Sequence, residues 1–171
     1  MAPVDLRPMT PQDLDAVLAL QANGYPPALH DSADAFLSRM ALAPDLNLVA
    51  YLGDGLAGYL VSHPWDAGAP PPVDARLTPP DLAACWYVHD LSVADSARGL
   101  GLGLRLLRQG RDRAMALGLR RSELVAVEGA GEFWRRLGWI PPSPISQDLA
   151  AKVASYGPAA AFMTLDDLSR L

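Results

Sequence analysis

The chain has 171 residues, of which 50% are hydrophobic and 19% charged, a balance that is typical of a folded domain and excludes a disordered chain. Its single cysteine, Cys85, excludes an internal disulfide framework and a cysteine-based zinc cluster. The net charge of −5 argues against nucleic acid as a partner, and no apolar run reaches the roughly 18–20 residues that a membrane span needs.

The first part of the chain predicts one strand and two helices. Alternating residues at 4–7 predict the strand. Thr10, which precedes a proline at the first helical position, predicts the start of a helix that ends near Gly24. Ser32 is the N-cap candidate of a second helix, whose apolar residues recur at helical spacing as far as Ala43.

A hairpin and a long loop follow. The runs 46–52 and 56–62 flank Asp54-Gly55, and Asp-Gly between alternating runs is a strong hairpin signal. Residues 63–81 contain six of the sixteen prolines and little periodicity, which predicts a long ordered loop between strands. Too few residues precede this loop to form a core of their own, so we expect residues 1–171 to form a single domain.

The second half of the chain predicts a further alternation of strands and helices. In order, these are a strand at 84–93, a glycine-rich turn at 95–103, a helix at 104–117, a strand at 123–127, a short helix at 132–137 and a final strand at 160–165. The order of all the predicted elements indicates an α/β fold, in which helices cover both faces of a mixed sheet.

The strongest chemical signal is the glycine-rich turn Arg98-Gly99-Leu100-Gly101-Leu102-Gly103, which lies between a predicted strand and a predicted helix. The first amides of a helix lack intrahelical acceptors, and glycines let the backbone approach a diphosphate closely. A dinucleotide-binding fold is disfavoured, because no acidic residue ends a second strand in the required place. A Walker loop is excluded, because neither Lys-Ser nor Lys-Thr follows the glycines.

The distribution of charge agrees with an anion site in this part of the chain. Residues 1–97 carry a balance of −9, whereas residues 98–136 carry +5, with nine arginines against four acidic residues. An otherwise acidic protein therefore gathers its positive charge around the glycine-rich turn. Some of these arginines are expected to be solvated residues on the outer face of a helix.

Three blocks of residues carry a family resemblance. They are Leu91-Ser92-Val93, the spacing Arg98-x-x-Gly101-x-Gly103, and the segment 131–139, GEFWRRLGW. With them, the chain resembles the GCN5-related N-acetyltransferase (GNAT) superfamily. The resemblance implies a mixed central sheet of about six to seven strands, splayed after the fourth strand. It also implies transfer of an acetyl group from acetyl-CoA, by direct attack, to a primary amine of a small molecule, peptide or protein.

The resemblance also implies how acetyl-CoA is held. The strand that ends at Val93 would present backbone groups to the pantetheine arm, and the amides of the glycine-rich turn would hold the pyrophosphate. Trp134 is expected to be a core aromatic residue that also walls the cofactor site. The expected cofactor-binding residues are Leu91, Ser92, Val93, Arg98, Gly99, Leu100, Gly101, Leu102, Gly103 and Trp134. No metal is expected, because three scattered histidines make no convincing metal site.

The chain departs from the family pattern at the usual proton donor. A tyrosine commonly follows the position of Phe133, but here Trp134 stands there, and its indole does not titrate. Asp90 and His89 are the candidate bases, and strand alternation predicts that only one of them faces the cleft. Histidine titrates near neutral pH, whereas aspartate needs a raised pKa or a bridging water. Tyr156 is the candidate acid.

The acceptor site has no local signature in the sequence. Tyr25, His63 and Trp65 are predicted to lie in loops beside the cleft, where they either shape the acceptor pocket or pack on the sheet. The acidic first part of the chain favours a cationic acceptor. A possible homodimer is an expectation at the level of the family.

Two other functions stay open at this point. The first is an acyl-CoA-binding sensor without transferase turnover, which the missing tyrosine supports. The second is an unrelated nucleotide-binding α/β domain. The N-terminal residues lack the basic and apolar pattern of a signal peptide, so we expect a cytoplasmic protein.

Overall fold

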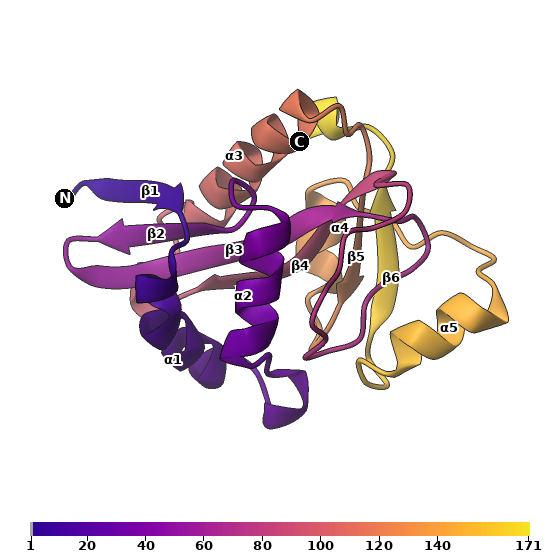
Figure 1. Cartoon of the computed structure of the whole chain (residues 1–171), viewed down its shortest axis with the longest axis horizontal. Helices are drawn as coiled ribbons and strands as arrows, with labels where there is room; N and C mark the ends of the chain where they lie inside the picture. Colours follow the sequence, from indigo (N-terminus) through magenta and orange to yellow (C-terminus); the bar gives the residue numbers. More distant parts are fainter. Residues whose placement is uncertain (1) are drawn as a thin grey trace.

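The structure, a computed structural model, describes residues 2–171 (Figure 1). Its strands are β1 (Val4–Pro8), β2 (Leu48–Leu52), β3 (Gly55–Trp65), β4 (Cys85–Val93), β5 (Ser122–Ala126) and β6 (Ala161–Leu165). Its helices are α1 (Leu14–Gly24), α2 (Ala33–Leu42), α3 (Leu102–Ala116), α4 (Gly131–Arg136) and α5 (Gln147–Ala154). Short 3₁₀ helices occupy Pro11–Asp13, Pro27–Leu29, Asp95–Ala97 and Leu168–Arg170.

The strands form one six-stranded mixed sheet in the order β1-β2-β3-β4-β5-β6. Neighbours are antiparallel except for β4 and β5, which run parallel because α3 carries the chain back to the same end of the sheet. The β4–β5 ladder consists of two pairs, Trp86 with Ser122 and Tyr87 with Glu123. Beyond these pairs the two strands diverge, which confirms the predicted splay after the fourth strand.

Helices cover both faces of the sheet, as predicted (Figure 1). On one face, residues of α1 and α2 such as Phe36 pack against Val49 of β2. On the other face, residues of α3 and α4 such as Leu106 pack against Leu48 of β2. Successive side chains of a strand point to opposite faces, so one short strand contributes to both cores. The candidate site lies between these layers, where β4 and β5 separate.

The strand β3 is longer than the sequence predicts. It continues through His63 and Trp65, so the proline-rich loop begins after Trp65 rather than at residue 63. Proline is disfavoured inside a sheet because it lacks an amide donor. At Pro64, however, β3 pairs with β4 alone, since its pairing with β2 ends at Leu60. The missing amide therefore costs no bond to β2.

Other element boundaries also differ from the prediction. The helix α3 begins at Leu102, two residues earlier than expected, so the last residues of the predicted turn are helical. The helix α5 has no counterpart among the predicted elements. It starts after Ser146, whose hydroxyl accepts the Leu149 amide at 3.1 Å, and it buries Leu149 and Val153 against β5 and β6.

Candidate active site

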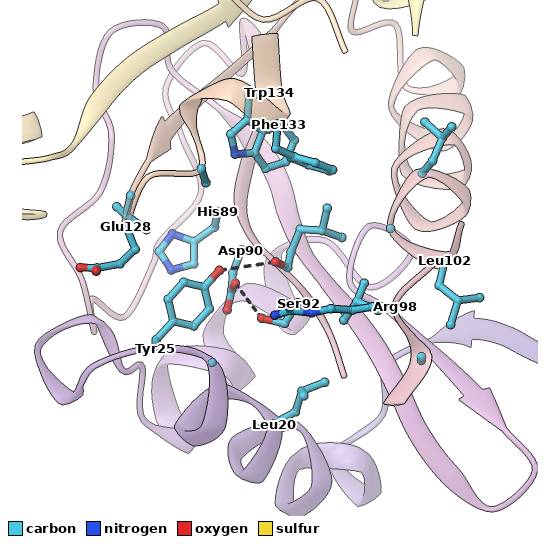
Figure 2. A pocket seen from close by; sticks show the side chains of 18 of the residues that line it. Leu20, Tyr25, His89, Asp90, Ser92, Arg98, Leu102, Glu128, Phe133 and Trp134 are labelled. Atoms are coloured by element: carbon cyan, nitrogen blue, oxygen red, sulfur yellow. Dashed lines mark hydrogen bonds between the residues drawn. The ribbon is translucent and has the colours of Figure 1, made fainter. Parts of the chain in front are cut away.

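The diverging strands β4 and β5 open onto a cavity of about 700 Å³, called the main cavity below. Its walls come from the end of α1, the second half of β4, the turn before α3, the end of β5 and α4. Figure 2 shows Arg98 and Leu102 on one side of this cavity and Glu128, His89 and Tyr25 on the other. A cavity of this volume suits a small-molecule ligand.

The glycine-rich turn forms one end of the main cavity. Gly99 and Gly101 adopt φ angles of 80° and 72°, which glycine reaches at little cost. The first main-chain bond of α3 runs from the Arg105 amide to the Gly101 carbonyl at 3.1 Å. The amides before Arg105 therefore have no intrahelical acceptor, and the helix dipole favours an anion beside them. This donor set fits the diphosphate expected from the sequence.

Most of the predicted cofactor-binding residues do line the main cavity. Those that line it are Leu91, Ser92, Val93, Arg98, Gly99, Gly101, Leu102, Gly103 and Trp134. Leu100 instead points outward with 41% of its surface exposed. The Arg98 guanidinium pairs with Asp95 at 3.0 Å and is largely exposed, so its charge lies at the mouth of the cavity.

Other arginines of residues 98–136 interact away from the main cavity. Arg108 donates to the Leu171 carbonyl at 3.3 Å, and Arg113 donates to the Asp45 carbonyl at 2.8 Å. Arg121 pairs with Glu123 at 2.6 Å. Of the nine arginines in this stretch, Arg98 is the one that lines the main cavity. The concentration of positive charge is therefore largely independent of the glycine-rich turn.

A β-bulge places His89 and Asp90 together in the wall of the main cavity. On β3, Val61 pairs with Asp90 and Ser62 pairs with Val88, so His89 is the extra residue between two pairs. A bulge interrupts the alternation of side chains along a strand. Both His89 and Asp90 line the cavity, and the prediction that only one of them faces it is therefore wrong.

The Asp90 carboxyl is buried among hydrogen-bond donors. The Tyr59 hydroxyl donates to Oδ2 at 2.5 Å, and the Ser92 hydroxyl donates to Oδ1 at 3.5 Å. Burial raises the pKa of Asp90, although the hydrogen bond from Tyr59 acts in the opposite direction. A carboxyl with a raised pKa exchanges its proton closer to neutral pH than an ordinary aspartate does.

His89 is held by a buried carboxylate on the α1–α2 connection. Its Nε2 lies 2.6 Å from Oδ2 of Asp31, and Oδ1 of Asp31 lies 3.6 Å from the Arg39 guanidinium. Burial alone would raise the pKa of Asp31, but the charge and hydrogen bond of His89, together with Arg39, lower it to about 2. Asp31 was not among the predicted site residues, because its partner His89 lies 58 positions away in the sequence.

The tyrosines Tyr25 and Tyr156 occupy different places. Tyr25 lines the main cavity, and its hydroxyl donates to the Leu91 carbonyl at 3.4 Å (Figure 2). Tyr156 borders only a small cavity of about 30 Å³, whose wall also includes Tyr25, His89 and Asp90. Its hydroxyl donates to the Pro71 carbonyl, and burial raises its pKa to about 12.

His63 and Trp65 do not lie in a loop beside the cleft, which corrects that prediction. Both belong to β3, and neither is among the residues that line the main or the small cavity. The ring of His63 is fully buried and meets Trp65 edge-on, with 5.1 Å between centroids. Burial lowers the pKa of His63 to about 3. It is thus a neutral core residue.

Glu128 and Phe133 complete the wall of the main cavity on the side of β5 and α4. Glu128 adopts a φ of 49°, in the left-handed region that costs a non-glycine residue roughly 1–2 kcal/mol. Phe133 is 44% exposed and packs edge-on against Trp134, with 5.0 Å between centroids. In the sequence, only its place before the short helix distinguishes Glu128.

Within residues 2–171, none of the helices has the length and apolar character that crossing a membrane demands. The same residues contain no group of three or more His, Cys, Asp or Glu side chains arranged to hold a metal ion.

Comparisons with known proteins agree with this architecture. The family model described as the acetyltransferase (GNAT) family matches residues 14–139. Among solved structures, the loading GNATL domain of CurA from Lyngbya majuscula matches with a TM-score of 0.79 at 14% identity, covering 99% of this chain and 100% of that chain. A comparison with curated proteins gives no match.

Two further solved structures resemble the chain. Arabidopsis thaliana Naa50, in complex with the bisubstrate analogue CoA-Ac-MVNAL, has a TM-score of 0.67 and 17% identity, covering 94% of this chain and 96% of that chain. N-acetylglutamate synthase from Neisseria gonorrhoeae, complexed with coenzyme A and N-acetyl-glutamate, has a TM-score of 0.70 and 19% identity, covering 96% of this chain and 35% of that chain. At these identities the likeness shows the fold alone.

Proposed function

Because the chain belongs to the GNAT family of acetyltransferases, we propose that it transfers the acetyl group of acetyl-CoA to a primary amine. One observation carries this proposal: a single cavity joins the anion-binding turn Gly99–Gly103 to the proton-accepting side chains His89 and Asp90. The first feature suits a diphosphate, and the second suits removal of a proton from an amine.

The cofactor would lie along the gap between β4 and β5. The amides of the glycine-rich turn would hold its pyrophosphate, and Arg98 would add charge at the mouth. The backbone of Leu91–Val93 faces the gap and would bind the pantetheine arm, while Phe133 and Trp134 wall the opposite side. When bound, acetyl-CoA supplies an acetyl thioester, which is already activated toward an amine.

The chain's own residues would then orient the amine and move protons. A protonated amine would first release one proton to solvent. Asp90 or His89 would then accept one proton from the neutral amine as its nitrogen bonds to the acetyl carbon and the carbon–sulfur bond breaks. Tyr25 is the tyrosine in the wall of the main cavity and would donate a proton to the departing sulfur. We favour Tyr25 over Tyr156, because Tyr25 lines the main cavity and Tyr156 does not.

The test is the release of free CoA thiol from acetyl-CoA in the presence of a panel of amines. A transferase releases thiol in proportion to the acetylated amine that mass spectrometry detects. Acetyl-CoA binding with no thiol release from any amine would contradict the proposal. That result would support a sensor, the function that Trp134 in place of a tyrosine favours.

A further inference from the structure

We infer that the acceptor is a small aliphatic amine without a carboxylate, which the site prefers to peptides and protein N-termini. The inference rests on the proposed function and concerns the acceptor end of the main cavity, which is lined by Tyr25, His89, Asp90 and Glu128. This end lies opposite the glycine-rich turn (Figure 2). Two independent observations support the inference: a barrier behind this end, and the sign of its charge.

The barrier consists of Leu29, Val73 and Tyr156, called the plug below. These residues border the small cavity but not the main cavity, and the two cavities adjoin because His89 and Asp90 line both. They come from three separate connections of the chain, and they pack together with the side chains of the cluster around β5, β6 and α5. The space left inside is about 30 Å³, which is room for only one or two water molecules. An extended peptide therefore cannot continue past the acceptor amine in this direction.

The plug is fixed to its neighbours by hydrogen bonds. The Asp74 amide donates to Oδ1 of Asp31 at 2.7 Å, and the Ser32 amide donates to Oδ1 of Asp74 at 2.7 Å. These reciprocal bonds join the loop of Val73 to the connection that carries Leu29. The Tyr156 hydroxyl donates to the Pro71 carbonyl of the same loop. Opening the plug would break several of these bonds together, so it is part of the folded structure.

The acceptor end is electronegative. Asp90 and Glu128 line it directly, whereas Asp31 lies behind His89 and its charge is balanced by its pairing with His89 and Arg39. Among the described residues that line the main cavity, the arginine is Arg98 at the far end, and there is no lysine. Arg39 is fully buried behind Asp31 rather than in the cavity wall. A protonated amine is attracted to this end, whereas an acceptor with its own carboxylate is repelled.

The experiment measures CoA thiol release by the full chain with three kinds of acceptor. They are short alkyl monoamines and diamines, free amino acids, and a five-residue peptide with a free N-terminus. We expect kcat/KM for the best small amine to exceed that for the peptide and for amino acids by about tenfold or more. An equal or higher kcat/KM with the peptide or with an amino acid overturns the inference.

A variant tests the plug itself. Leu29→Ala with Val73→Ala shortens two of its side chains and should raise kcat/KM for the peptide severalfold, with the KM for acetyl-CoA unchanged. The matched control is Leu82→Ala in the same loop, where the side chain is 81% exposed and peptide activity should not change. If the double variant loses its fold, as judged by its melting temperature, Val73→Ala alone serves the same purpose.

The two proposals fail in different ways. A folded plug variant without any gain in peptide activity shows that Leu29, Val73 and Tyr156 do not limit the acceptor. Absence of thiol release with every acceptor, small or peptide, contradicts the transferase proposal instead, because then no acceptor class exists to be defined.

Discussion

Asp31, which contacts His89, and Asp90, which follows it in the chain, have pKa values that shift in opposite directions. Burial raises the pKa of Asp90, which suits a group that takes up and releases a proton. Asp31 is also buried, but His89 and Arg39 lower its pKa to about 2, so it stays charged. One carboxyl is therefore suited to chemistry and the other to holding the His89 ring.

Asp90→Asn should lower kcat by about 100-fold or more, because an amide cannot accept the proton of the acceptor amine. Its affinity for acetyl-CoA, measured by calorimetry, should not change. In the wild type, kcat/KM should rise with pH as Asp90 loses its proton, above the range of an ordinary aspartate. If Asp90→Asn and His89→Ala both leave turnover unchanged, neither residue is the base.

Asp31→Asn should destabilise the protein by about 2–3 kcal/mol at pH 7, judged by urea unfolding. The pKa of Asp31 is about 2 in the folded protein, below the roughly 3.9 of an unfolded aspartate. Its contribution is therefore complete above about pH 5 and is lost as the pH falls from there through about 2. The difference in the free energy of unfolding between Asp31→Asn and the wild type should therefore be smaller at pH 3 than at pH 7. The control is Asp54→Asn, at an exposed residue of the hairpin. A stability difference between Asp31→Asn and the wild type that does not change with pH contradicts the prediction.

Individual residues of the site differ in whether the sequence alone can predict their role. The glycines at 99–103 have a local pattern with a direct physical meaning, and all three of them line the main cavity. Asp31 and His89 meet only after the chain has folded, across 58 positions. The bulge at His89 arises from pairing with β3, which no property of β4 alone predicts.

At the scale of elements, the junction of β4 and α3 is the part of the fold that defines the site. Gly101→Asp should weaken acetyl-CoA binding by at least about tenfold, because it places a negative charge beside amides that attract an anion. The matched control is Gly101→Asn, which has the same shape, tolerates the φ of 72° and adds no charge. Equal affinities for the two variants contradict the anion site, and so does wild-type affinity in Gly101→Asp.

The contact of α3 with the sheet allows a second test at this scale. A Cβ at Gly110 would lie 2.7 Å from Leu60 and 2.8 Å from Trp86. Gly110→Ala should therefore destabilise the protein by about 1–3 kcal/mol through overpacking, although alanine favours a helix by about 1 kcal/mol. Thermal unfolding measures the effect. The control is Asp112→Ala on the exposed side of the same helix, whose free energy of unfolding should stay within about 0.5 kcal/mol of wild type. A Gly110→Ala variant that is more stable than the wild type contradicts the close packing.

Elements with a strong local sequence pattern form where the sequence predicts them, whereas the other elements depend on tertiary contacts. The hairpin of β2 and β3 forms around Asp54-Gly55 as predicted. The helix α5 is short, and Ser146 caps it. The proline-rich segment before it makes its start hard to predict from the sequence. The last residues of β3 are strand because β4 pairs with them, despite a proline that favours a loop.

At the scale of the whole molecule, ligand binding should stabilise the fold. Acetyl-CoA at about one hundred times its Kd should add about 2.7 kcal/mol to the free energy of unfolding, seen as a higher melting temperature. Gly101→Asp should lose most of this effect. Stabilisation by ATP or NAD but not by acetyl-CoA would contradict the proposed function and favour an unrelated nucleotide-binding domain.

The net charge of −5 is unevenly distributed over the folded molecule. The acidic first part of the chain contributes Asp90 to the acceptor end, whereas the arginine-rich part contributes Arg98 to the other end of the main cavity. Acidic and basic side chains therefore lie at opposite ends of one cavity, an arrangement that would suit the amine and the diphosphate of the proposed function.

The two-pair ladder between β4 and β5 has one more consequence. Past Tyr87, the inner edge of β4 is a strand edge inside the protein, with main-chain groups that lack a neighbouring strand on that side. Most proteins blunt or cover such edges. Here an elongated ligand would act as the missing strand, so the sheet is completed from outside the chain. Recognition of this kind would read the main chain of β4 rather than its side chains.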